Sequence, residues 1–329
     1  MPKFYLKTFG CAQNTADSER IKAFYQHKGW QEVVDWKKAD EIIINSCIVR
    51  ESAENRVYGL INNIRKNSVA RKPKIILTGC LAAVAKQIKG VDEILPINQI
   101  TTAAEPLRCR QKTALISITS GCNHFCSYCI VPYTRGREVS RPSKEILKEI
   151  DQAIKNGFKE ILLIGQNVNS WNNNKFPQLL ETIANRPLNK ISFVSSNPWK
   201  FSDELIKVIA RHNNIDRLIH LPLQSGDDKI LKKMNRGYTA ADYLNLIEKI
   251  KSKVKNSKFS TDIIVGFPGE DEKAFQNTVK LCRRVGFEIA YINKYSPRPG
   301  TISAKIYPDN VPQTEKKRRW KILNELINK

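Results

Sequence analysis

Short runs of β-branched and aliphatic residues alternate with segments of helical period along the whole chain. In the first third, this pattern predicts strands at 3–9, 41–46, 74–79 and 93–97, and helices at 15–28, 50–66 and 81–89. Strands and helices that alternate in this way form parallel sheets covered on both faces. We therefore predict an α/β fold that begins with a doubly wound parallel-sheet domain over residues 1–105.

The same alternation restarts after a polar stretch at 98–113 that has no clear period. Strands are predicted at 114–119, 160–166, 191–196, 217–224, 259–266 and 288–295, with helices near 143–156, 176–185, 203–212, 239–256 and 271–285. Six such units predict a (β/α)6 partial TIM barrel over residues 112–329. This second domain ends in a basic amphipathic helix near 312–328.

The sequence is strongly basic, and its charge is more informative about function than its hydrophobic content is. Lys and Arg number 55 against 32 acidic residues, a formal net charge of +23, which favours a polyanionic partner such as nucleic acid. No apolar run approaches the roughly 20 residues that cross a bilayer, and the first residues lack a signal-peptide pattern. We therefore expect a cytoplasmic protein without membrane contact. For the positive charge, the simpler alternative to a polyanionic partner is a basic surface that faces solvent.

Three cysteines lie within eight residues of the loop that follows the first strand of the second domain. Cys122, Cys126 and Cys129 have the spacing CxxxCxxC, and thiolates suit iron–sulfur clusters and zinc. His124 would complete a Cys3His zinc set, although four ligands would crowd so short a loop. On a cubane cluster, three ligands leave one iron open to a small molecule.

Three further cysteines are distant in sequence but equivalent in position. Cys11, Cys47 and Cys80 each follow the carboxyl end of a predicted strand by one or two residues. In a doubly wound sheet these ends share the edge where ligands bind, so the three thiolates are expected together. The alternative is that small buried cysteines favour strand ends for packing. Cys109 and Cys282 have no suggestive spacing, and we interpret them as structural.

CxxxCxxC with Tyr128 before its last cysteine resembles the signature of the radical S-adenosylmethionine (SAM) enzymes. Together with the upstream cysteines, the segments GQNVNSW, HLPLQSGDDKILKKMNRGYT, TDIIVGFPGE and YSPRPGT resemble the methylthiotransferases from about residue 3 to residue 328. TFGC and CIVPYTRGRE resemble the MiaB-type branch, which makes 2-methylthio-N6-isopentenyladenosine in tRNA. Ala12 and Gln13 depart from the usual first motif.

The family normally continues into a small β-barrel TRAM domain that binds RNA; the sequence stops at Lys329, where that domain would begin, and we expect the domain to be absent. We therefore expect RNA to be held by other surfaces or by an RNA-binding partner that replaces that domain.

The resemblance implies a transferase that adds a methylthio group to carbon 2 of N6-isopentenyladenosine next to the anticodon, using two SAM molecules and two [4Fe-4S] clusters. One cluster would lie on Cys122, Cys126 and Cys129 and bind SAM, and an auxiliary cluster would lie on Cys11, Cys47 and Cys80. A monomer served by a reducing protein such as flavodoxin or ferredoxin is expected. The alternatives are N6-threonylcarbamoyladenosine or a ribosomal protein as substrate, or a non-catalytic zinc-containing RNA-binding protein.

Polar residues at the strand ends of the barrel, with one aromatic residue, are the candidates for SAM binding: Tyr128, Gln166, Asn167, Ser196, Gln224 and Asp262. Basic residues near the cysteines and in the last helix are the candidates for RNA contact: Arg50, Arg56, Arg135, Arg137, Arg141, Lys317, Arg318 and Arg319. The simpler interpretations are loop hydrogen bonds for the first set and a solvated helix for the tail. VGFPGE lacks the GKS/T of a P-loop, so we expect no nucleoside triphosphate site.

Overall fold

The computed structural model describes residues 1–329 except 49–50, 69–71, 101–104 and 109–111. It divides into two compact units: unit 1 comprises Met1–Gln111 with Ile130–Arg137, and unit 2 comprises Lys112–Cys129 with Glu138–Lys329. The predicted boundaries did not anticipate that residues 130–137 pack with unit 1. In the described parts of the chain, no helix is both long and apolar enough to cross a membrane.

Unit 1 is built on a five-stranded parallel sheet with the order β2-β1-β3-β4-β5. The strands are β1 (Lys3–Phe9), β2 (Gln31–Glu32), β3 (Glu41–Ser46), β4 (Lys74–Gly79) and β5 (Glu93–Ile94). The central strands β3 and β4 are near-continuous apolar runs because both of their faces are covered. The doubly wound parallel sheet is thus as predicted.

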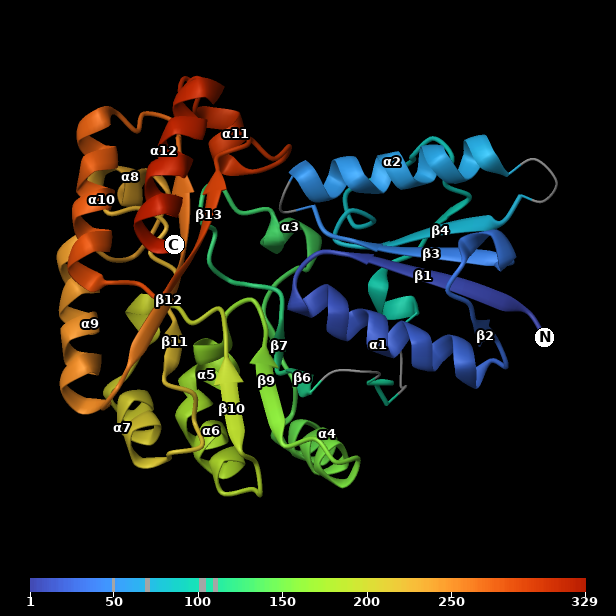
Figure 1. Ribbon diagram of the computed structural model, residues 1–329, viewed down its shortest axis with the longest axis horizontal. Coiled ribbons are helices and arrows are strands. Elements are labelled where there is room, and N and C mark those ends of the chain that lie inside the picture. Colours follow the sequence, from blue (N-terminus) through green and yellow to red (C-terminus); the bar gives the residue numbers. More distant parts are fainter. Residues whose placement is uncertain (49–50, 69–71, 101–104, 109–111) are drawn as a thin grey trace. The chain divides into compact units, whose positions relative to one another are not determined.

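The two long helices of unit 1, α1 (Ala12–His27) and α2 (Glu51–Asn67), cover opposite faces of this sheet (Figure 1). Ile43 packs with Ile21 of α1, whereas its neighbours Ile42 and Ile44 pack on the other face with Ile61 of α2. This alternation follows from the two-residue period of a strand.

The predicted helix at 81–89 is wrong, because this segment forms turns. Its Ala, Lys and Gln residues favour a helix, but a helix this short is marginal unless packing supports it. Instead, Leu81 and Ile88 reach the core from irregular backbone. Two short 3-10 helices complete unit 1, at Trp36–Lys38 and Ile97–Gln99.

Unit 2 contains the six predicted strands, arranged as an open part of a barrel. They are β6 (Thr113–Ser117), β9 (Glu160–Ile164), β10 (Lys190–Phe193), β11 (Leu218–His220), β12 (Lys258–Val265) and β13 (Ile289–Lys294). Two parallel three-stranded sheets have the orders β10-β9-β6 and β11-β12-β13. The carboxyl ends of parallel strands lie on one rim of such a barrel, and active-site residues lie on the loops of that rim.

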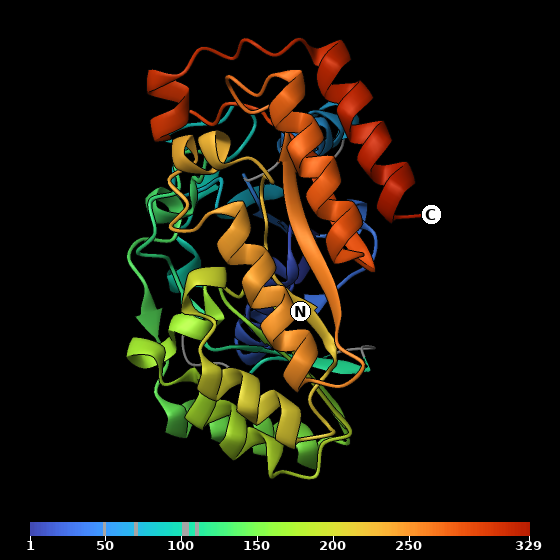
Figure 2. The same cartoon turned by 90° about the vertical axis from the view of Figure 1, so that its left-hand side faces the viewer.

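Six longer helices of unit 2 match the prediction: α4 (Ser143–Lys155), α6 (Phe176–Ala184), α7 (Asp203–Arg211), α9 (Ala240–Lys253), α10 (Glu272–Val285) and α12 (Gln313–Ile327). Figure 2 shows α9, α10 and α12 running along the outside of the unit. Short elements that the pattern did not reveal are β7 (Thr119–Ser120), β8 (Val139–Ser140), α5 (Trp171–Asn174), α8 (Asp228–Lys233) and α11 (Ile302–Ile306), with α3 (Val131–Thr134) in unit 1.

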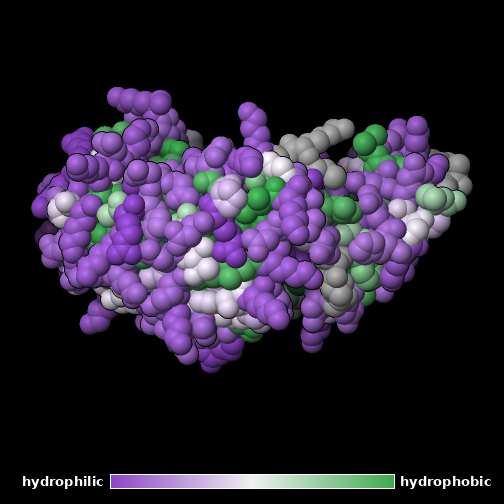
Figure 3. Space-filling model, turned by 90° about the horizontal axis from the view of Figure 1, so that it is seen from below, coloured by the Kyte–Doolittle hydropathy of each residue, from purple (hydrophilic) through white to green (hydrophobic). Residues whose placement is uncertain are grey.

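The surface fits the charged composition of the sequence. Hydrophilic side chains cover most of the face shown in Figure 3, and the apolar ones form small scattered groups. Isolated apolar side chains of this kind are normal for a protein in water.

Candidate functional site

The register of the unit 1 sheet brings the first set of cysteines to one edge. Phe9 pairs with Ser46, which pairs with Gly79, so the ends of β1, β3 and β4 form one row. Cys47 and Cys80 are the next residues of their strands, and Cys11 is two residues beyond Phe9. The set flanks the junction of β1 and β3, where the strand order reverses and where ligands bind in open α/β sheets.

The environment of Cys80 favours its thiolate. Cys80 and Cys47 are buried, whereas Cys11 is exposed at the N-terminus of α1. A hydrogen bond from Cys47, followed by the positive charge of Arg135, outweighs burial and lowers the pKa of Cys80 to about 6. Because the thiolate is the form that binds metal, this site suits a thiolate ligand.

Arg135 lies in this group of residues rather than on the surface. Its Nε–H donates to Sγ of Cys80 at 3.2 Å, and its Nη2 pairs with Asp17 at 2.8 Å. The side chain is only 7% exposed, so the predicted phosphate contact at Arg135 needs correction. One carboxylate, Asp17, and one sulfur, that of Cys80, already occupy the guanidinium that a phosphate would need.

The second set of cysteines lies in the loop that follows β7 of unit 2. Cys122 and Cys126 are buried and Cys129 is half-buried. Burial raises the pKa of Cys122 to about 11, and the backbone N–H of His124 lies 3.4 Å from its Sγ. Among the described residues, no three Cys, His, Asp or Glu side chains converge on a single metal ion. An iron–sulfur cluster does not require that arrangement, because each of its thiolates binds a separate iron.

Arg236 is a residue of this loop's surroundings that the sequence analysis did not single out. Its Nη1 donates to Sγ of Cys126 at 3.3 Å. The guanidinium lies 4.8 Å from the ring of Trp199 and 5.2 Å from that of Tyr238, and it has no carboxylate partner within the described ranges. Aromatic faces stabilise a buried cation, and a positive charge here suits an anionic cluster. Arg236 lies in MNRGYT, a segment that resembles the methylthiotransferases, and this resemblance could have indicated it.

Three of the residues predicted to bind SAM carry buried polar atoms without a partner. Within the described residues, Oδ1 and Nδ2 of Asn167, Oγ of Ser196 and Oε1 of Gln166 make no hydrogen bond. Buried polar groups in native proteins nearly always have partners. A polar ligand on this rim would supply them, so these residues fit SAM.

The loops that carry these atoms are tied together. Asn169 and Asn197 exchange two hydrogen bonds of 2.8 Å, which join the loop after β9 to the loop after β10. At Gly165 a Cβ would lie 2.1 Å from Oγ1 of Thr119, so the backbone requires glycine there. Ser195 and Gln224 have positive φ of 63° and 68°, a strain that concentrates at ligand sites.

The remaining SAM candidates have more ordinary surroundings. The backbone of Gln224 bonds to β12 on both sides, and Asp262 lies 3.1 Å from Nε2 of His220. His220, a residue that the sequence analysis missed, also contacts Ser260 at 3.1 Å through Nδ1. Tyr128 packs against an apolar cluster that includes Met234, and burial raises its pKa well above the usual value.

The basic residues predicted for RNA contact differ in how exposed they are. Arg56 and Arg137 are exposed, and Arg56 lies 5.7 Å from the ring of Phe9. Arg141 donates to the carbonyl of Ser117 and pairs with Glu149 at 2.8 Å. Arg50 and Cys109 lie outside the described residues.

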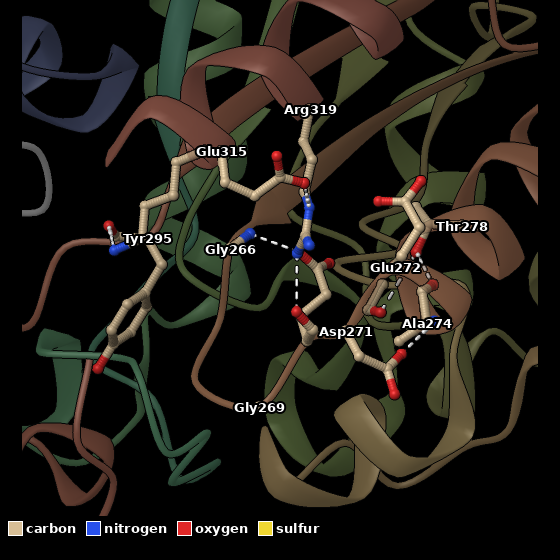
Figure 4. Close-up of polar contacts among 12 residues, drawn as sticks. Gly266, Gly269, Asp271, Glu272, Ala274, Thr278, Tyr295, Glu315 and Arg319 are labelled. Carbon is tan, nitrogen blue, oxygen red and sulfur yellow. Dashed lines mark hydrogen bonds and ion pairs between the residues drawn. The ribbon is translucent and has the colours of Figure 1, made fainter. Parts of the chain in front are cut away.

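Two basic residues of the last helix form ion pairs with other parts of unit 2. Lys316 is fully buried and pairs with Asp309 at 2.6 Å. Arg319 pairs with Glu270 at 2.8 Å, and its side chain is 5% exposed. Figure 4 shows its guanidinium reaching the loop between Gly266 and Asp271. The predicted RNA contact at Arg319 therefore also needs correction.

The segment VGFPGE, residues 265–270, takes part in these contacts through its last residue, Glu270. Glu270 accepts a hydrogen bond from the backbone N–H of Gly266 and pairs with Arg319, so a carboxylate closes this loop. Lys317 is exposed, and Arg318 is exposed but pairs with Glu315 and Glu272.

Comparison with known proteins agrees with this site. Residues 116–282 match the family described as the Radical SAM superfamily, and residues 3–98 match Uncharacterized protein family UPF0004. Proteins named tRNA-2-methylthio-N(6)-dimethylallyladenosine synthase from Parabacteroides distasonis and Fusobacterium nucleatum are each 38% identical to this chain. The alignments cover 99% and 100% of this chain and 80% and 84% of those proteins.

Solved structures show the same fold at low sequence identity. The radical S-adenosylmethionine methyltransferase TsrM from Kitasatospora setae has a TM-score of 0.66 and 14% identity, covering 92% of this chain and 75% of its own. The cobalamin-dependent radical enzyme OxsB has a TM-score of 0.59 and 10% identity, covering 99% of this chain and 56% of its own. At these identities the likeness concerns the fold alone.

The fold and the CxxxCxxC loop define an enzyme of the radical SAM superfamily, which uses SAM and iron–sulfur chemistry. Within that superfamily, the chain belongs to the methylthiotransferase family of the tRNA-2-methylthio-N(6)-dimethylallyladenosine synthases. It is thus a transferase of sulfur-containing groups, and the non-catalytic zinc protein considered above is not supported.

Proposed function

We propose that this protein adds a methylthio group to carbon 2 of N6-isopentenyladenosine next to the anticodon of tRNA, using two SAM molecules and two [4Fe-4S] clusters. The observation that carries the proposal is the pair of cysteine sets, one in each unit. Cys11, Cys47 and Cys80 follow one row of paired strand ends, in addition to the CxxxCxxC loop. The names of the relatives and the net charge of +23 support a tRNA substrate.

When bound, the cluster on Cys122, Cys126 and Cys129 would supply the electron that cleaves SAM, and the auxiliary cluster would supply the sulfur. The chain's own residues position these groups. Arg236 donates to Cys126, and Arg135, whose side chain is nearly buried, donates to Cys80.

The polar rim of unit 2 would hold SAM in one orientation. Asn167, Ser196 and Gln166 offer hydrogen-bonding atoms that the protein itself leaves unused within its described part. Interactions of this kind are worth most in a site that excludes water, because an unpaired buried group costs roughly 1–3 kcal/mol. They would hold SAM beside the CxxxCxxC loop.

Exposed basic residues are the proposed phosphate contacts. We propose phosphate contacts for Arg56, Arg137 and Lys317. We propose the same for Arg318, which is exposed and also pairs with two carboxylates. We further propose a cytoplasmic monomer that receives electrons from flavodoxin or ferredoxin, with an additional RNA-binding partner where these contacts do not suffice.

Mass spectrometry of tRNA nucleosides tests this function. The anaerobically reconstituted protein is given SAM, a reductant and tRNA that carries isopentenyladenosine. The expected result is a methylthio mass gain on that nucleoside. A gain only on threonylcarbamoyladenosine, or cleavage of SAM without any nucleoside product, would contradict the proposed substrate.

A further inference from the structure

Arg135 connects the two halves of the sequence in an unexpected way. It stands six residues after Cys129, yet the segment that contains it packs with unit 1, and its Nε–H lies 3.2 Å from Sγ of Cys80. The CxxxCxxC loop is thus followed at once by a donor to a cysteine of the other set.

The position of this guanidinium is fixed from the opposite side. Asp17 of α1 pairs with its Nη2 at 2.8 Å, and the other oxygen of Asp17 accepts a hydrogen bond from Nε2 of Gln13 at 3.0 Å. Both side chains of the ion pair are nearly buried, with exposures of 7% for Arg135 and 11% for Asp17. Separating the two side chains would leave a nearly buried charge without its partner, which costs free energy. The ion pair therefore holds the guanidinium in place.

We propose that Arg135 is a positioning residue of the auxiliary cluster, which orients the Cys80 sulfur by an N–H···S hydrogen bond and raises the reduction potential of the cluster. This inference rests on the proposed two-cluster function. The potential of an iron–sulfur cluster depends on nearby charge and on hydrogen bonds to its sulfurs. Reduction adds negative charge, so Arg135 favours the reduced form and Asp17 opposes it.

The two partners therefore predict shifts of opposite sign. The full chain with Cys122, Cys126 and Cys129 replaced by alanine leaves the auxiliary cluster alone, and its potential is measured by an anaerobic redox titration followed by electron paramagnetic resonance. Arg135→Gln shifts the potential to more negative values, whereas Asp17→Asn shifts it to more positive values.

Two further variants separate charge from structure. Arg135→Lys retains the charge without the planar donor, so its negative shift is smaller than that of Arg135→Gln; it also serves if the glutamine variant does not fold. Arg65→Gln is the matched control, because Arg65 also pairs with a carboxylate, Asp92, which binds the N–H of Ile75 at the opposite end of β4. This control leaves the potential unchanged.

Iron and sulfide analysis distinguishes the possible failures. A triple-alanine protein without iron and sulfide contradicts the two-cluster function and with it the role of Arg135. A cluster that is present but has the same potential in Arg135→Gln, Arg135→Lys and Asp17→Asn contradicts the role of Arg135 alone. Shifts of the same sign in Arg135→Gln and Asp17→Asn also contradict it.

Discussion

Nη1 of Arg236 donates to Sγ of Cys126 at 3.3 Å, from a half-buried position beside the rings of Trp199 and Tyr238. A charged donor to a cysteine sulfur is worth more than a neutral one, about 1.5–3 kcal/mol. Within the described residues no carboxylate pairs with Arg236, so its charge is not neutralised beside the sulfur.

Replacing Arg236 by lysine should slow the cleavage of SAM. The variant keeps the charge but loses the fork that bonds Cys126, Pro222 and Tyr238 together. We expect a loss of roughly tenfold or more in 5′-deoxyadenosine formation, which corresponds to about 1.4 kcal/mol or more. Arg186→Lys, at an exposed pair with Asp151 in the same unit, should retain the rate. Equal rates in both variants would show that the contact with Cys126 is incidental.

Two asparagines of one loop give a matched pair for the SAM site. Asn167 and Asn169 are both 2% exposed, but within the described residues only the side-chain amide of Asn169 has hydrogen-bond partners. Asn167→Ala should weaken SAM binding roughly tenfold or more and leave the thermal stability of the cofactor-free protein unchanged or higher. Asn169→Ala should lower the free energy of unfolding by about 1–3 kcal/mol, because its loss leaves buried backbone groups of Asn197 without partners.

Calorimetric SAM titration and thermal unfolding of the two variants measure both quantities. Stability loss in Asn167→Ala without a change in SAM affinity would mean that its amide serves the fold and not the ligand.

Two adjacent lysines of the last helix have opposite surroundings, and we propose RNA contact only for the exposed one, Lys317. Lys316→Met removes a buried ammonium that donates to Asp309 and to the carbonyl of Tyr295, and it should cost about 1–3 kcal/mol of unfolding free energy. Lys317→Met, at the adjacent exposed position, should leave stability within about 0.5 kcal/mol.

The same two variants address tRNA binding. Lys317→Met should weaken it and reduce the salt dependence of the affinity, because one phosphate contact is lost. If Lys317→Met binds tRNA with the wild-type salt dependence, this face of the helix does not contact RNA.

The strands were predictable because their apolar runs are long and buried on both faces, as in Glu41–Ser46. The cysteine positions were predictable for the same reason, since parallel strands end at a common edge. The surroundings of the arginines were not. Arg135 and Arg319 look like surface charges in sequence, and only tertiary packing brings Asp17 and Glu270 against them. A charge pattern does not reveal which cations are paired over long separations.

We propose that the two cysteine sets serve separate steps, one the cleavage of SAM and the other the supply of sulfur, and a paired product measurement distinguishes these steps. 5′-Deoxyadenosine and 2-methylthio-N6-isopentenyladenosine are quantified together in reactions of the wild type and of the Cys11→Ala/Cys47→Ala/Cys80→Ala protein. We predict that the variant still forms 5′-deoxyadenosine but no methylthio nucleoside. Methylthio product from the variant at the wild-type level would contradict the account.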